Sequence, residues 1–317
     1  MAEKYYAGTY WPGRHEPMEA YARRAGSFFR RLAPLDGAFS QWCEQASSQE
    51  EARTRRFEPD EETLMGLFHK EKYHQGAGDI AFAAWNGMGE GNSVASISCG
   101  SRSRHVVDRC TLTLPPHGPV AERLLSASIL SQVVSAMALS WDPEWGIATS
   151  VTHRDNSSEF ADPGTFVGWV TYLARHRGTV PPLPAPVRIE QIEDKGTLIV
   201  LTPERFTASN PEHVALAERV RELLDRAGLL KPLQAQRALE AAPGLAVGAR
   251  PNCSGSAPPG SSPPGAFRSL QAEGPRQRQH LHLDGARFTQ GRGRRPRGGA
   301  GGEHVVHQQH ALPRDIR

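Results

Sequence analysis

Apolar and polar residues follow helical and strand periods along the first 240 residues, and this order stops beyond that point. Apolar side chains recur every three or four residues over 16–32, which predicts an amphipathic helix. The segment 118–138 is apolar on most faces, so we expect a helix there at the centre of the core. A further helix is predicted from Asn210 to Ala227, because Asn210 is a good N-cap and Gly228 can end the helix. Its predicted buried stripe is Leu216, Val220, Leu223 and Ala227.

Runs of β-branched and aromatic residues between turn residues predict strands. These runs are residues 4–11, 80–85, 93–99, 106–114, 145–151, 166–173, 187–192 and 197–201. Short helices are predicted over 35–45 and from Pro59, and the polar run 46–56 is interpreted as a loop or a frayed helix end. The order of these elements predicts an α+β fold, with a mainly antiparallel sheet packed against helices.

Charge divides the chain where the hydrophobic pattern stops. Residues 1–240 hold 26 Lys and Arg against 30 Asp and Glu, whereas the other 77 residues hold 11 Arg, no Lys and 4 acids. The formal net charge of +3 therefore describes neither part. We expect an α+β domain over residues 1–240 and a disordered Gly-, Pro- and Arg-rich tail over residues 241–317.

The tail allows two interpretations. A GC-rich gene read in the wrong frame would give such a lysine-free, arginine- and proline-rich segment, which would then be a functionless extension. Alternatively, its arginines could bind phosphates by charge. The chain shows neither a signal peptide nor an apolar run long enough for a membrane helix, so a cytoplasmic location is expected.

No motif in the sequence indicates a catalytic or metal site. Asp142 and Glu144 are the carboxylates most like a catalytic pair, but Pro143 separates them and the segment is interpreted as a turn. The histidines of the tail lack a rigid element that could fix metal ligands, so no metal or cofactor is predicted. The cysteines form no CxxC pair and are expected to be reduced. They are Cys43, Cys99, Cys110 and Cys253.

Several segments, in this order, resemble the immunity protein 52 family. They are Tyr5–Trp11, Trp141–Gly146, Gly168–Leu173, Pro184–Arg188, Leu201–Phe206 and Asn210–His213. The resemblance covers about residues 4–232, and the tail has no counterpart in the family. It implies a cytoplasmic antidote encoded beside a polymorphic toxin, which often carries a restriction-endonuclease-like nuclease domain. Such an antidote needs no catalysis and no cofactor, because it acts by binding its toxin.

The mildly acidic body would complement the basic surface of a nuclease toxin. The candidate toxin-binding residues are in or near predicted loops: Asp142, Glu144, Trp145, Glu159, Asp162, Glu193 and Asp194. Two alternatives remain. The protein could be an enzyme that modifies the toxin or its target, or a nucleic-acid-binding protein that acts through the arginine-rich tail. Neither a membrane nor a nucleic-acid partner is expected for the body.

Overall fold

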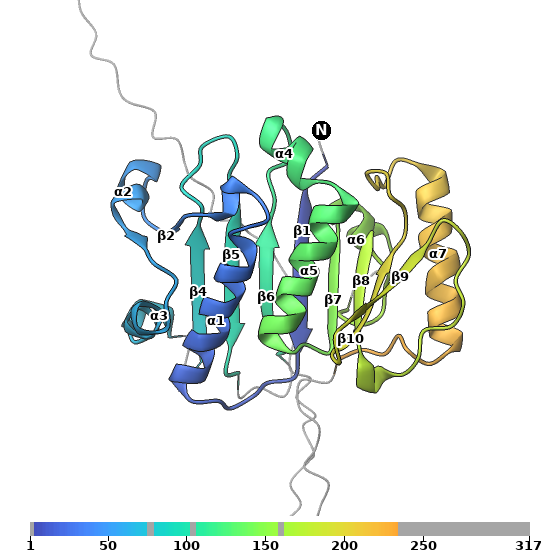
Figure 1. The fold of residues 1–317 in the computed structure, drawn as a ribbon, viewed down its shortest axis with the longest axis horizontal. Helices are drawn as coiled ribbons and strands as arrows, with labels where there is room; N and C mark the ends of the chain where they lie inside the picture. Colours follow the sequence, from blue (N-terminus) through green and yellow to red (C-terminus); the bar gives the residue numbers. More distant parts are fainter. Residues whose placement is uncertain (1–2, 75–78, 102–105, 158–161, 234–317) are drawn as a thin grey trace, which may run out of the picture. The chain divides into compact units, whose positions relative to one another are not determined.

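The strands form one ten-stranded antiparallel sheet in the order β3-β2-β4-β5-β6-β1-β7-β8-β10-β9 (Figure 1). The computed structural model describes residues 3–74, 79–101, 106–157 and 162–233. The strands are β1 (Tyr5–Trp11), β2 (Trp42–Glu44), β3 (Arg56–Phe57), β4 (Ile80–Trp85), β5 (Val94–Cys99), β6 (Asp108–Thr113), β7 (Trp145–Ser150), β8 (Val170–Ala174), β9 (Arg188–Ile192) and β10 (Gly196–Val200). The predicted antiparallel α+β fold is confirmed.

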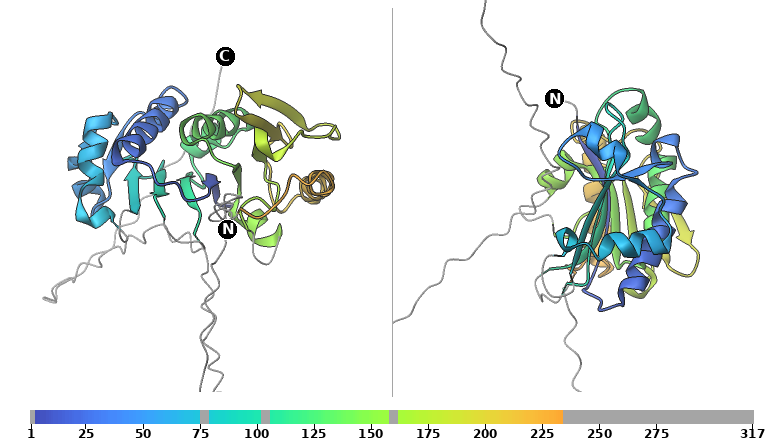
Figure 2. Two further views of the ribbon diagram at one scale, coloured as in Figure 1. Left: turned by 90° about the horizontal axis from the view of Figure 1, so that it is seen from below. Right: turned by 90° about the vertical axis from the view of Figure 1, so that its left-hand side faces the viewer.

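Seven α-helices accompany the sheet in the part of the chain that is described. They are α1 (Met18–Leu32), α2 (Gln49–Thr54), α3 (Glu61–Phe68), α4 (Pro119–Leu124), α5 (Ala127–Trp141), α6 (Val151–Ser157) and α7 (Pro211–Arg226). Helices α1 and α5 lie side by side over one face of the sheet (Figure 2). Helix α5 is the central helix that the sequence predicts, and its Trp141 stacks on Trp11 of β1 with 5.2 Å between ring centroids.

Over most of strands β4, β5 and β6, no helix of the described residues covers the other face of the sheet (Figure 2). At one end, Ala52 of α2 packs against Trp85 and Val94. Side chains alternate strictly along β5, where buried residues face α1 and half-exposed ones point away from it. We call the half-exposed side the open face. Its residues are Ala81, Ala83, Val94, Ser96, Ser98, Arg109 and Thr113.

The prediction of a helix over 35–45 is wrong. A single 3₁₀ turn (Gly37–Phe39) forms, with the Asp36 carboxylate accepting from the Ala38 N–H, and β2 follows. Trp42 is buried when this segment pairs with β3 and β4, and its indole N–H donates to the Phe39 carbonyl at 3.0 Å. Burial of one large aromatic side chain in the sheet outweighs the local helical pattern.

Hydroxyl side chains set two boundaries that the periodicity misses. The predicted helix 118–138 divides into α4 and α5, because the Ser126 hydroxyl caps a new helix by accepting from the Ile129 N–H. Ser150 likewise accepts from the His153 N–H, and the unpredicted helix α6 begins directly after β7. The residues of α7 that are buried are Ala217, Val220 and Leu224, so the predicted stripe is correct only at Val220.

The cysteine prediction holds where the structure describes it. Cys43, Cys99 and Cys110 are buried free thiols. Burial raises the pKa of the Cys99 and Cys110 thiols, so both are protonated at neutral pH and unreactive. Cys253 and the whole predicted tail, 241–317, lie outside the described residues.

Candidate functional site

Four of the predicted acids meet at one end of the sheet, the lower end in Figure 1. Asp142 ends α5 in the left-handed conformation, with φ of 51°, and the chain then enters β7. The Glu144 backbone joins two strands, since its N–H donates to Tyr10 and its carbonyl accepts from Ala174. The β9–β10 turn lies beside this segment because Lys195 forms an ion pair with Asp142 at 3.2 Å. Glu193 and Asp194 of that turn thus join acids about fifty positions earlier in the chain.

The four acids differ in how far they are already neutralised. Asp142 is paired with Lys195, and Glu144 lies 3.5 Å from Arg177 and 3.7 Å from His176. Glu193 and Asp194 are exposed, and neither forms an ion pair with any of the described residues. An unpaired carboxylate breaks no existing ion pair when it binds a cation of the partner. Glu193 and Asp194 are therefore the acids most available for binding.

The other three candidates do not join this group. Trp145 is completely buried, between Tyr10 and Phe166 at ring-centroid distances of 5.5 and 5.1 Å. Trp145 is therefore part of the core, and its prediction as a toxin-binding residue is wrong. The register of β7 against β1 places its side chain inside the protein. Asp162 is exposed in the loop before β8, and Glu159 lies outside the described residues.

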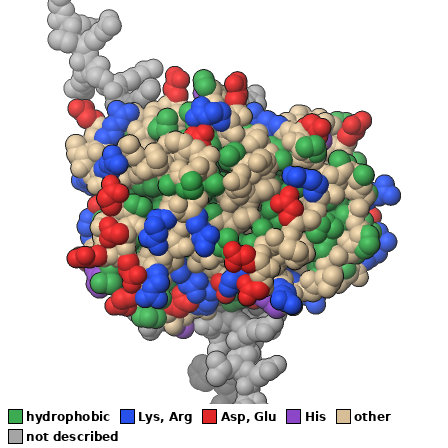
Figure 3. All heavy atoms as spheres, in the orientation of Figure 1, with side chains coloured by type: hydrophobic (Ala, Val, Ile, Leu, Met, Phe, Trp, Pro, Cys, Tyr) green, Lys and Arg blue, Asp and Glu red, His purple; other side chains and the backbone are tan. Residues whose placement is uncertain are grey.

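Basic residues that the sequence did not single out hold this end of the sheet together. Arg24 forms a two-bond ion pair with Glu16 at 2.8 Å and donates to the Ser140 carbonyl at 3.1 Å. Arg14 donates to the Trp141 carbonyl. Both cations thus satisfy carbonyls at the C-terminus of α5, where the helix dipole favours positive charge. In Figure 3, basic and acidic side chains are interspersed over the lower part of the surface that faces the viewer.

Arg177 fastens the last described segment to this end. Its side chain is 8% exposed, and it donates to the carbonyls of Leu229 and Lys231 at 3.1 Å. Burial lowers the pKa of Arg177, but the neighbouring Glu144 carboxylate opposes that shift. A shallow cavity of about 290 Å³ lies beside it. No sequence signal connects Arg177 with these carbonyls, because the contact depends on where the chain returns after α7.

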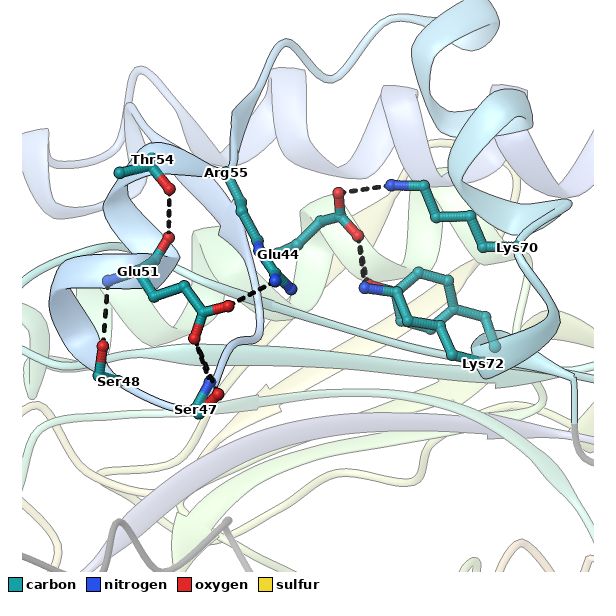
Figure 4. A network of polar contacts seen from close by, with 9 residues as sticks. Glu44, Ser47, Ser48, Glu51, Thr54, Arg55, Lys70 and Lys72 are labelled. Atoms are coloured by element: carbon teal, nitrogen blue, oxygen red, sulfur yellow. Dashed lines mark hydrogen bonds and ion pairs between the residues drawn. The ribbon is translucent and has the colours of Figure 1, made fainter. Parts of the chain in front are cut away.

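A second charged cluster surrounds Glu44 of β2, near the opposite edge of the sheet (Figure 4). The carboxylate accepts from Lys70 at 2.7 Å, from Lys72 at 2.8 Å and from the Tyr73 hydroxyl at 2.8 Å. Burial alone would raise the pKa of Glu44, but these three donors outweigh it and lower the pKa to about 2. Such a carboxylate stays ionised at neutral pH and acts as a structural anchor.

The Glu44 cluster should make the stability of the protein sensitive to acid. Because the pKa of Glu44 is depressed in the folded state, its contribution is complete above pH 4.5 and is lost as the pH falls towards 2. We expect the free energy of unfolding of Glu44→Gln to fall less steeply than that of the wild type across this window. Urea titrations at several pH values measure the difference, and parallel pH profiles for the two proteins would contradict the assignment.

The His153 ring and the Ser157 hydroxyl, with 3.2 Å between Nε2 and Oγ, cannot act as a base and a nucleophile. His153 Nε2 lies 2.9 Å from the Val167 carbonyl, which can only accept, so this nitrogen carries the proton. It is therefore unable to take a proton from Ser157, whose hydroxyl donates to the His153 carbonyl at 2.7 Å. Burial also lowers the pKa of His153. Within the described ranges, no group of three or more His, Cys, Asp or Glu side chains could hold a metal ion.

The sequence that builds this end of the sheet matches the model of a protein family. The model of that family, Immunity protein 52, aligns with residues 3–233. The chain belongs to the immunity protein 52 family. Proteins of this family are immunity proteins of polymorphic toxin systems, and all the described acids at the lower end of the sheet fall inside the matched range.

The Immunity protein 52 chain also aligns with a solved structure. The Pseudomonas aeruginosa T6SS protein PA0821 aligns with a TM-score of 0.48 and 14% identity, over 75% of this chain and 77% of that one. A search of curated proteins finds no match. Of the helices that the structure describes, none combines the length and apolar character needed to cross a membrane.

Proposed function

We propose that this immunity protein neutralises its cognate toxin by direct binding, and that the toxin is a nuclease. The observation that carries the proposal is the meeting of Asp142, Glu144, Glu193 and Asp194 at one end of the sheet. Two of these carboxylates are exposed and without an ion-pair partner in the described part of the chain. A nuclease holds phosphates with Lys and Arg, and an acidic turn on a rigid hairpin is a suitable complement to such a surface.

The turn is well placed to act as a rigid contact. The Lys195 N–H donates to the Ile192 carbonyl at 2.9 Å, and the Arg175 N–H donates to the Lys195 carbonyl at 2.8 Å. The first bond closes the turn around Glu193 and Asp194, and the second holds the turn against the end of β8. Little conformational entropy is then lost when the two carboxylates contact a partner, which favours tight binding.

Reversing the charges of Glu193 and Asp194 should weaken toxin binding without affecting folding. We expect Glu193→Lys with Asp194→Lys to weaken toxin affinity by about 10-fold or more, since like charges would then face each other. The affinity of the wild type should also fall with added salt more steeply than that of the variant. Titration calorimetry with an inactive form of the toxin domain encoded beside the gene measures both quantities, and growth during co-expression measures protection.

The matched control reverses two exposed acids near the other edge of the sheet, Glu71→Lys with Glu90→Lys. The control carries the same change in net charge and should bind as the wild type does. Equal weakening of both variants would show a non-specific charge effect and remove the role of the turn. Protection of cells without any measurable binding would overturn the direct-binding mechanism and favour an enzymatic one.

A further inference from the structure

The open face is a shallow, polar area in the middle of the sheet. Most of its side chains are small, namely Ala81, Ala83, Ser96, Ser98 and Thr113. Register places them in adjacent rows across three strands, with Ala83 opposite Ser96 and Ala81 opposite Ser98. Small side chains let the backbone of a partner approach a sheet closely, and the hydroxyls can hydrogen-bond to it.

Two buried tyrosines of β1, Tyr6 and Tyr10, form a low ridge along one side of the open face. Tyr6 pairs with Thr113 and Tyr10 pairs with Arg109 in the β1–β6 register. The Tyr10 ring lies across Gly8, because a Cβ atom built at Gly8 would be only 2.9 Å from the Tyr10 hydroxyl oxygen. Glycine at this position therefore lets the ring lie flat, so the ridge stays low.

The charges on and beside this ridge are mainly positive. Arg109 is half-exposed on β6, and no ion pair joins it to an acid in the described part of the chain. Arg154 of α6 lies over the Tyr6 ring at 5.6 Å and is paired only with its neighbour Asp155. Burial raises the pKa of Tyr10, whereas Arg109 and Arg154 oppose this shift, which places both guanidinium groups near the same hydroxyl.

We propose that the open face is a docking surface for an acidic segment of the cognate toxin, with Arg109 as the anchor for a carboxylate. This inference rests on the proposed function and adds a second, oppositely charged contact to it. Arg109 supplies a guanidinium that has no carboxylate partner among the described residues, and arginine binds carboxylates through two parallel hydrogen bonds. The small residues beside it leave room for the backbone that carries the acid. Toxin binding would then use acidic and basic contacts together, which favours one partner over others.

The test uses the full chain and an inactive form of the toxin domain encoded beside the gene. We expect Arg109→Glu to weaken toxin affinity by at least about 10-fold, and Arg109→Lys, which keeps the charge but loses the second hydrogen bond, to weaken it less. The matched control is Arg219→Glu, an exposed arginine on α7 without an ion pair among the described contacts. Circular-dichroism melts show whether each variant folds as the wild type does.

A steric variant tests the surface independently of charge. Ser96→Trp adds a bulky side chain to the open face and should weaken binding, whereas Ser128→Trp on the exposed side of α5 should not. If the wild type binds the toxin and Arg109→Glu and Ser96→Trp bind equally well, the open face is not the docking surface. If the same two variants change only the oligomeric state in light scattering, the face joins two copies of this chain and the inference is wrong. If the wild type does not bind the toxin, the proposed function fails as well.

Discussion

Replacing Trp169 with alanine is expected to lower the free energy of unfolding by about 3–5 kcal/mol, which is the usual effect of removing a large buried aromatic side chain. Trp169 is completely buried and lies edge-on to Tyr5 at 6.4 Å. Its indole N–H donates to the Thr202 carbonyl at 2.8 Å, and its own carbonyl accepts from Leu201. The residue thus joins the start of β8 to the segment after β10 and to β1, so a cavity here affects three parts of the sheet.

Urea unfolding followed by tryptophan fluorescence and circular dichroism measures this loss. Trp169→Phe is the informative companion, because it keeps most of the apolar volume and removes only the N–H donor. Its cost should be about 1–3 kcal/mol, the price of leaving the Thr202 carbonyl unsatisfied together with a smaller cavity. Equal destabilisation by the two substitutions would show that the hydrogen bond, and not the packing, dominates at this position.

Gly196→Ala should be the second severe substitution, with a loss of about 3 kcal/mol, at the upper end of ordinary overpacking. Gly196 begins β10 opposite Ala174. A Cβ atom there would lie 2.2 Å from the Leu173 carbonyl oxygen and 2.9 Å from the Tyr172 hydroxyl oxygen. Because one obstacle is backbone, the strands can only separate, and the β8–β10 pairing would be disrupted together with the acidic turn.

Gly66→Ala is the matched control for this experiment. Gly66 lies within α3, and a Cβ atom built there meets nothing within 4 Å. Alanine at this helical position should stabilise the protein by about 1 kcal/mol. Thermal melts of the two variants should therefore shift in opposite directions, and a stable Gly196→Ala protein would contradict the close approach of β8 and β10.

Local sequence patterns were enough to predict the helices and strands whose start and stop residues lie close together in the chain. Asn210 caps α7 as predicted, since its side chain accepts from the Glu212 N–H and proline follows it. The alternation in β5 also carried information that the prediction did not use. Its small, half-exposed residues mark a strand with one uncovered face, which is the only sign of the open face in the sequence.

The arrangement of the candidate site was beyond such patterns. Asp142 and Lys195 are neighbours because β7, β8 and β10 are adjacent in the sheet, and strand order is set by packing over the whole domain. The place of Trp145 was also beyond prediction from local sequence. Its position next to two acids is compatible with a surface anchor or with the core, and only the pairing of β7 with β1 decides between them.

The central position of β1 has a consequence for synthesis of the protein. Tyr5–Trp11 is made well before its partners β6 and β7, which end at Thr113 and Ser150. A ribosome adds roughly 5–20 residues per second, so this aromatic segment waits several seconds for both neighbours. Pairing of such distant segments also slows folding itself. A newly made chain therefore cannot complete the middle of its sheet until β7 has left the ribosome, and β1 lacks at least one of its neighbours until then.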